Sequence, residues 1–106
     1  MSDQRSPRVN SARLPNYLGQ TVRLTCKILK LQGDRTIVQA SDGGEVAVIQ
    51  LSGKSALDPY VEIVGRVEDA QTIKAMTSIN MGDNLDMKLV NDCVELTHDP
   101  RFASMF

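Results

Sequence analysis

Tryptophan is absent from this 106-residue sequence, which has only two tyrosines and two phenylalanines. The chain also has no large excess of charge of either sign: its formal net charge is -1. No overall electrostatic field therefore attracts it to nucleic acid or to an anionic membrane. The longest apolar runs extend over a few residues, which excludes a membrane-spanning helix, and the polar start MSDQRSPR lacks the apolar stretch of a secretory signal. The sequence therefore predicts one small globular domain.

Cysteine and histidine are scarce too. Cys26 and Cys93 lie far apart, with neither C-x-x-C spacing nor a disulfide framework, which favours a reducing compartment. His98 beside Asp99 is the one imidazole–carboxylate neighbour pair, and a histidine near a helix C-terminus is stabilised by the helix dipole. No nucleophile–base pair, metal-ligand spacing or phosphate-binding glycine loop is present, so the sequence predicts no enzyme, no catalytic residue, no metal site and no cofactor.

Alternation of apolar and polar residues is what the sequence does contain. A period of two recurs along the chain and predicts strands, and after the hairpin signal Asp42-Gly43-Gly44 a segment that is apolar on both sides predicts one more. These segments span residues 22–28, 35–41, 45–51, 60–69 and 72–81. The alternation changes phase at Leu29 and Leu31, which predicts a bulge or a strong bend. Gly65 interrupts the fourth segment, as at the bend of a barrel.

Five short strands linked by tight turns predict an all-β fold, a five-stranded OB-fold barrel, followed by a C-terminal amphipathic α-helix. A five-stranded SH3-like barrel is the alternative on strand count alone. The predicted organisation is a flexible tail over residues 1–8, a barrel over 9–84, and an oligomerisation helix with its tail over 85–106. Pro15 can open a single helical turn before the first strand, and Gly19 can close it.

Basic residues in the first two predicted strands are the candidates for contact with nucleic acid. They are Arg23, Lys27, Lys30 and Arg35. OB-folds bind single strands across their second and third strands, with stacking aromatics and a positive groove. None of the four aromatic residues lies in those two strands. We therefore expect weak nucleic-acid contact or, as the alternative, an ordinary solvated strand face.

The predicted helix, residues 86–99 with Asp86 as its N-cap, is unusually apolar. At about 100° per residue, half of its circumference is filled by Leu96, Leu89, Cys93, Thr97, Val90, Val94 and Met87. The opposite arc carries Lys88, Asn91, Asp92, Glu95, His98 and Asp99. An arc this wide favours contact with partner chains, as in a helical bundle. The alternative is a helix that caps its own barrel.

Three segments resemble the smallest subunit of the eukaryotic replication protein A heterotrimer. These are PRVNSARLPNYLGQTVRL before and in the first strand, VEIVGRVEDAQTI in the fourth, and LDMKLVNDCVELTHDPRF at the C-terminal helix. Together they cover Pro7 to Phe102. The resemblance implies an OB-fold whose helix joins one helix each from the large and middle subunits in a parallel three-helix bundle. It also implies a nuclear complex that coats single-stranded DNA in replication, repair and recombination, in which the small subunit mainly holds the trimer together.

The resemblance assigns the helix to the partner interface. One ridge consists of Leu89, Cys93 and Leu96, and the other of Met87, Val90 and Val94. The chain departs from the family where its helix lacks an aromatic residue and Cys93 occupies a packing position. Two alternatives share the architecture: an autonomous single-stranded nucleic-acid-binding protein, and a small OB subunit of a telomere-capping complex. The first would bind labelled oligonucleotide by itself with a clear salt dependence.

Overall fold

The computed structural model describes residues 6–51 and 57–101. Along the chain the elements are β1 (Arg8–Val9), the 3-10 helix η2 (Ser11–Tyr17), β2 (Thr21–Gln32), β3 (Arg35–Ala40), β4 (Glu45–Ile49), β5 (Tyr60–Asp69), β6 (Thr72–Asn80) and α1 (Met87–Thr97). All five predicted strands are present, and the predicted helical turn is longer than expected because it starts at Ser11. The first five residues of the predicted tail lie outside the described residues, whereas Arg8 belongs to β1.

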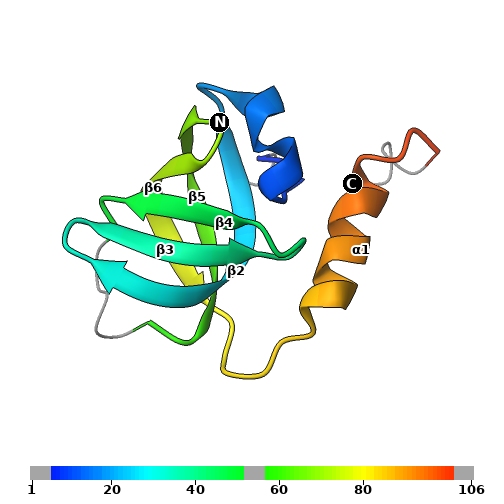
Figure 1. Cartoon of the computed structure of the whole chain (residues 1–106). Helices are drawn as coiled ribbons and strands as arrows, with labels where there is room; N and C mark the ends of the chain where they lie inside the picture. Colours follow the sequence, from blue (N-terminus) through cyan, green and yellow to red (C-terminus); the bar gives the residue numbers. More distant parts are fainter. Residues whose placement is uncertain (1–5, 52–56, 102–106) are drawn as a thin grey trace.

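A closed barrel is formed by β2, β3, β4, β6 and β5 in that order, with β5 pairing back onto β2 (Figure 1). Neighbouring strands are antiparallel except for β4 and β6, which are parallel. The short β1 adds to β2 in parallel, with Arg8 opposite Arg23. This is the Greek-key barrel that the sequence predicted.

The core consists of the inward residues of the alternating strands. Fully buried members include Leu24 of β2, Val38 of β3, Val48 of β4, Ile63 of β5 and Ile73 of β6. In β3 and β4 these residues alternate with less buried ones, as the pleat of a strand buried on one side requires. In β2 and β5 the outward residues Thr25 and Glu62 are buried as well. The barrel therefore fills its own interior.

Two irregularities bend the barrel where the sequence predicted them. Between Ile28 and Lys30 the register of β2 against β3 shifts by one residue, so Leu29 is the extra residue of a bulge. A second shift separates Val64 from Gly65 in the pairing of β5 with β6. Bulges increase local twist, which closing so small a barrel requires.

Helix α1 stands outside the barrel, at the end of the connection 81–86, and its C-terminal end lies beside η2 (Figure 1). Polar contacts from α1 reach the N-terminal segment at Asn10 and the β3–β4 turn at Ser41. Among the described residues, no helix is long and apolar enough to cross a membrane.

Candidate partner interface and nucleic-acid face

Asp86 caps the N-terminus of α1, as predicted: its side chain accepts a hydrogen bond from the backbone N–H of Leu89 at 3.1 Å. At the other end the backbone N–H of His98 donates to the carbonyls of Glu95 and Leu96. The helix therefore has defined ends and comprises eleven residues, three turns long.

One apolar ridge of α1 is left uncovered by the barrel. Leu89 is 60% exposed and Leu96 is 44% exposed, and Cys93 lies between them, also exposed. A row of exposed apolar side chains on one helix face is typical of a protein–protein contact. These three candidate interface residues are accessible to another chain.

The second ridge faces the chain's own barrel. Val94 is 1% exposed and is the one buried residue of α1, while Met87 and Val90 are half-buried. The barrel therefore covers part of this ridge and leaves Leu89 and Leu96 of the other ridge uncovered.

A groove of about 320 Å³ separates α1 from the outer face of β2 and β5. It is lined by Arg8, Thr25, Glu62, Met81, Leu89, Val90, Cys93 and Val94. At its floor the buried carboxylate of Glu62 pairs with Arg8 and with Arg23, each at 3.3 Å. A buried carboxylate needs such partners, so the floor of the groove is electrostatically satisfied and its walls are apolar.

Sequence reasoning missed the residues that attach α1 to the barrel. Asn91, Glu95 and His98 lie on the predicted polar arc, and their side chains contact Asn10, Arg13 and Tyr17. A spacing of four and then three residues places Asn91, Glu95 and His98 along one line of the helix. This spacing is the one sequence signal that could have identified them as contact residues.

His98 and Asp99, the neighbouring imidazole and carboxylate, each contact other groups. The Nε2 atom of His98 lies 2.7 Å from the carbonyl oxygen of Arg8, and Asp99 accepts hydrogen bonds from Arg101. Those bonds lower the pKa of Asp99. Within residues 6–51 and 57–101, no three His, Cys, Asp or Glu side chains gather so that they could hold a metal ion.

The four candidate basic residues do not form one patch. The side chain of Arg23 is 17% exposed and pairs with Glu62, and in the sheet Arg23 lies opposite Arg8 of β1. Lys27 lies over the ring of Tyr60, 6.0 Å from its centre. Lys30 is exposed opposite Ile37 of β3, and Arg35 is exposed at the start of that strand. Lys27, Lys30 and Arg35 share the outer face of β2 and β3, whereas Arg23 is committed elsewhere.

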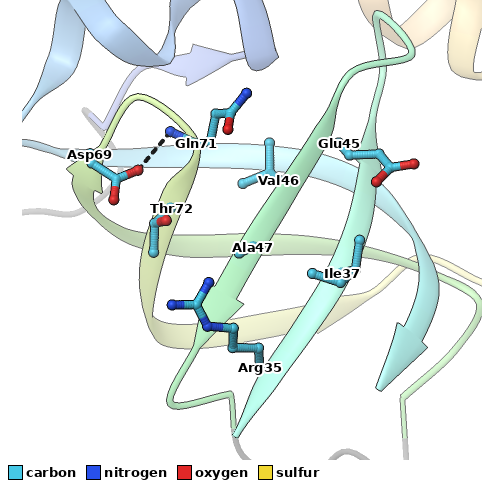
Figure 2. Close-up of a pocket in the computed structure, with 8 residues that line it drawn as sticks. All are labelled: Arg35, Ile37, Glu45, Val46, Ala47, Asp69, Gln71 and Thr72. Atoms are coloured by element: carbon cyan, nitrogen blue, oxygen red, sulfur yellow. Dashed lines mark hydrogen bonds between the residues drawn. The ribbon is translucent and has the colours of Figure 1, made fainter. Parts of the chain in front are cut away.

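Arg35 also lines a pocket of about 290 Å³ between β3, β4 and the β5–β6 turn (Figure 2). In OB-folds this region, the second and third barrel strands with the loop between the fourth and fifth, is the usual ligand face. Figure 2 shows Asp69, Gln71 and Thr72 on the turn across from Arg35. Hydrogen bonds from Gln71 and Thr72, with the charge of Arg35, lower the pKa of Asp69. None of the described residues lining the pocket is aromatic, so it offers no stacking surface.

Comparison with known proteins decides the family. The family model described as replication factor A protein 3 matches residues 1–103. The chain belongs to this family, the small subunits of replication protein A. A replication protein A 14 kDa subunit of Arabidopsis thaliana is 31% identical over 90 residues, 85% of this chain and 84% of the relative. Replication factor A protein 3 of Schizosaccharomyces pombe is 25% identical over 103 residues, 95% of this chain and 94% of the relative.

Two solved structures share the fold of this replication factor A protein 3 family member. A chain of U. maydis replication protein A, solved bound to single-stranded DNA, matches with a TM-score of 0.85 and 31% identity, covering 95% of this chain and 94% of that chain. The OB-fold prediction is therefore confirmed. The S. pombe Stn1–Ten1 complex matches with a TM-score of 0.67, but at 10% identity, over 89% of this chain and 92% of that chain. That likeness shows the fold alone.

Proposed function

We propose that this chain is the non-catalytic small subunit of a nuclear replication protein A heterotrimer that binds single-stranded DNA in replication, repair and recombination. In this proposal α1 packs with one helix from the large subunit and one from the middle subunit, as a three-helix bundle. The observation that carries the proposal is the uncovered ridge of Leu89, Cys93 and Leu96 on a member of the replication factor A protein 3 family.

The energetics favour a partner over a solvated ridge. Fully burying a leucine side chain is worth about 1.5 to 3 kcal/mol. Leu89 and Leu96 keep about half of that surface exposed, so covering both yields about 1.5 to 3 kcal/mol in total. The groove beside Val90 and Cys93 adds apolar wall for a neighbouring side chain. An interface built on such a ridge gains from burial that the barrel itself does not provide.

We further propose that this subunit adds little direct affinity for DNA. The pocket at the usual OB-fold ligand face holds Arg35 together with the carboxylates of Glu45 and Asp69, and it has no aromatic residue among the described residues that line it. Arg23 is occupied by Glu62. Stacking contributes about 1 to 3 kcal/mol per base in single-strand binders, and this pocket lacks that contribution.

Co-expression with the large and middle subunits tests the assembly role. The wild-type chain should co-purify as a heterotrimer whose mass is the sum of the three chains, and Leu89→Asp should prevent assembly because it places a charge in a dry seam. Leu31→Asp is the matched control, since Leu31 is 54% exposed and lies near the end of β2, away from α1. A truncated chain lacking residues 86–106 that still co-purifies with both partners would overturn the proposal.

Titration of a labelled oligonucleotide tests the DNA part. The chain alone should bind no more tightly than about millimolar at low salt, because nonspecific contacts by a few lysines are weak. Tight binding with a steep salt dependence would instead make it an autonomous single-strand binder.

A further inference from the structure

Helix α1 is attached to the barrel chiefly by polar contacts. Val94 is its one buried residue, so apolar burial supplies only a small part of the attachment. An isolated helix of eleven residues is marginally stable in water. The helix therefore needs support from elsewhere in the chain if it is to exist before a partner binds.

Glu95 receives three of these contacts, among them the shortest. The guanidinium of Arg13 donates two hydrogen bonds to its carboxylate, from Nη2 at 2.6 Å and from Nε at 3.0 Å. The side-chain amide of Asn10, which is 2% exposed, donates to Glu95 at 2.8 Å and to Asn91 at 2.8 Å. Arg13 and then Asn10 lower the pKa of Glu95. A two-point guanidinium–carboxylate pair fixes orientation as well as distance.

His98 adds a second point of attachment, one turn further along α1. Its Nε2 atom lies 2.7 Å from the carbonyl oxygen of Arg8, and its Nδ1 atom 3.4 Å from the hydroxyl of Tyr17. Contacts at Asn91, Glu95 and His98 follow one line of the helix and so fix its rotation about its own axis. With that line against the barrel, Leu89 and Leu96 face outward.

The partners of α1 are themselves anchored to the barrel. The carboxylate of Asp42, in the β3–β4 turn, accepts hydrogen bonds from the backbone N–H of Ala12 at 3.0 Å and from the hydroxyl of Ser11 at 2.8 Å. Burial would raise the pKa of Asp42, but these bonds and one from the backbone of Gly44 outweigh it and lower that pKa. The start of η2 is thereby held on the turn, and α1 on η2.

We propose that the segment Arg8–Tyr17 positions α1 before any partner binds, with the Arg13–Glu95 pair as its main bond. The helix then meets its partners already folded and already rotated, with the ridge of Leu89, Cys93 and Leu96 presented outward. Arg13 and Asn10 are positioning residues: they act on partners through α1. The inference about positioning stands on this chain alone, and its consequence for assembly rests on the proposed function.

Amide hydrogen exchange of α1 in the isolated chain tests the positioning directly. Wild-type α1 should be protected, and Arg13→Glu or Glu95→Arg should each speed its exchange about tenfold, because each substitution replaces the pair with two like charges. The double variant Arg13→Glu with Glu95→Arg should restore most of the protection. Arg66→Glu, on an exposed position of β5, and Asp92→Arg, on an exposed position of α1, are the charge-matched controls and should leave it unchanged.

Assembly provides the second readout. Each single variant should weaken heterotrimer formation about tenfold, as a helix that must fold on contact loses affinity, and the double variant should recover it. Strand amides should remain protected in all variants, which separates loss of positioning from loss of the fold. Wild-type α1 amides that exchange at the unfolded rate, or a double variant no better than the singles, would overturn the inference. A protected α1 in a chain that never assembles would overturn the proposed function alone.

Discussion

Replacing Gly65 by alanine should destabilise the barrel sharply, and the reason is space. Gly65 lies in β5 between Val22 of β2 and Ala75 of β6, at the register shift. A Cβ atom there would lie 2.5 Å from the backbone carbonyl oxygen of Lys74 and 2.6 Å from the Cγ2 atom of Ile73. Ordinary contacts of this kind are about 1 Å longer. Because one of the two atoms belongs to the backbone, β5 and β6 must separate to admit the methyl group.

The cost follows from overpacking, which is about 1 to 3 kcal/mol for an added methyl in a tight core and lies at the upper end when backbone must move. For a domain near 100 residues, each kcal/mol lowers Tm by about 4 to 8 °C, so the expected loss is about 10 to 20 °C. Thermal unfolding followed by far-UV circular dichroism measures it. Gly33→Ala is the control: it has a positive φ of 58° but nothing within 4 Å of the added Cβ, and should cost about 1 kcal/mol. Equal losses in the two variants would refute the argument from space.

Three other predictions concern titration, reactivity and anchoring. Arg13 lowers the pKa of Glu95, so this pair stabilises the docked helix at pH values above the ordinary glutamate pKa of 4.5. That stabilisation is lost as the pH falls through the lowered pKa. Amide exchange of α1 measured from about pH 6 down to about pH 3 should show the loss. Burial raises the pKa of the Cys26 thiol to about 12, so a thiol reagent at mildly alkaline pH should label exposed Cys93 quickly and Cys26 only on unfolding, which intact mass will count. Asp42→Ala removes the acceptor for the start of η2 and should lower the free energy of unfolding by about 1 to 2 kcal/mol in urea titration, whereas an unchanged midpoint would contradict that anchoring.

Local patterns predicted most of the barrel. Period-two alternation identified most of the strands, and β3 shows why, since its buried residues alternate with less buried ones. The stretch that became β4 was identified by the turn before it and by its apolar residues. The change of phase at Leu29 located the bulge, and the glycine at position 65 located a bend. The parallel pairing of β4 with β6 followed from no local signal. This pairing joins strands that are far apart in the sequence, so it could be expected only from the fold class as a whole.

Features that depend on distant partners escaped prediction. The strand β1 has two residues, Arg8 and Val9, too few to show any period. Asn91 and Glu95 are ordinary polar helix residues by sequence, and their role depends on contacts with the N-terminal segment, about eighty residues away. The apolar arc of α1 was identified, but which of its two ridges the barrel would cover depends on those same polar contacts. The assignment of interface residues remains a prediction.

The extra residue in β2 has a consequence for how this family member can change in length. On either side of the bulge, Ile28 pairs with Val38 and Leu31 pairs with Thr36, and both of these β3 residues are buried. Removing Leu29 would therefore leave a strictly alternating strand with every remaining side chain on its present side. What would be lost is curvature, since β2 must follow β5 over its first half and β3 over its second. Leu29 thus serves as a spacer whose presence matters more than its chemistry: many side chains should be acceptable there, and a gap should not.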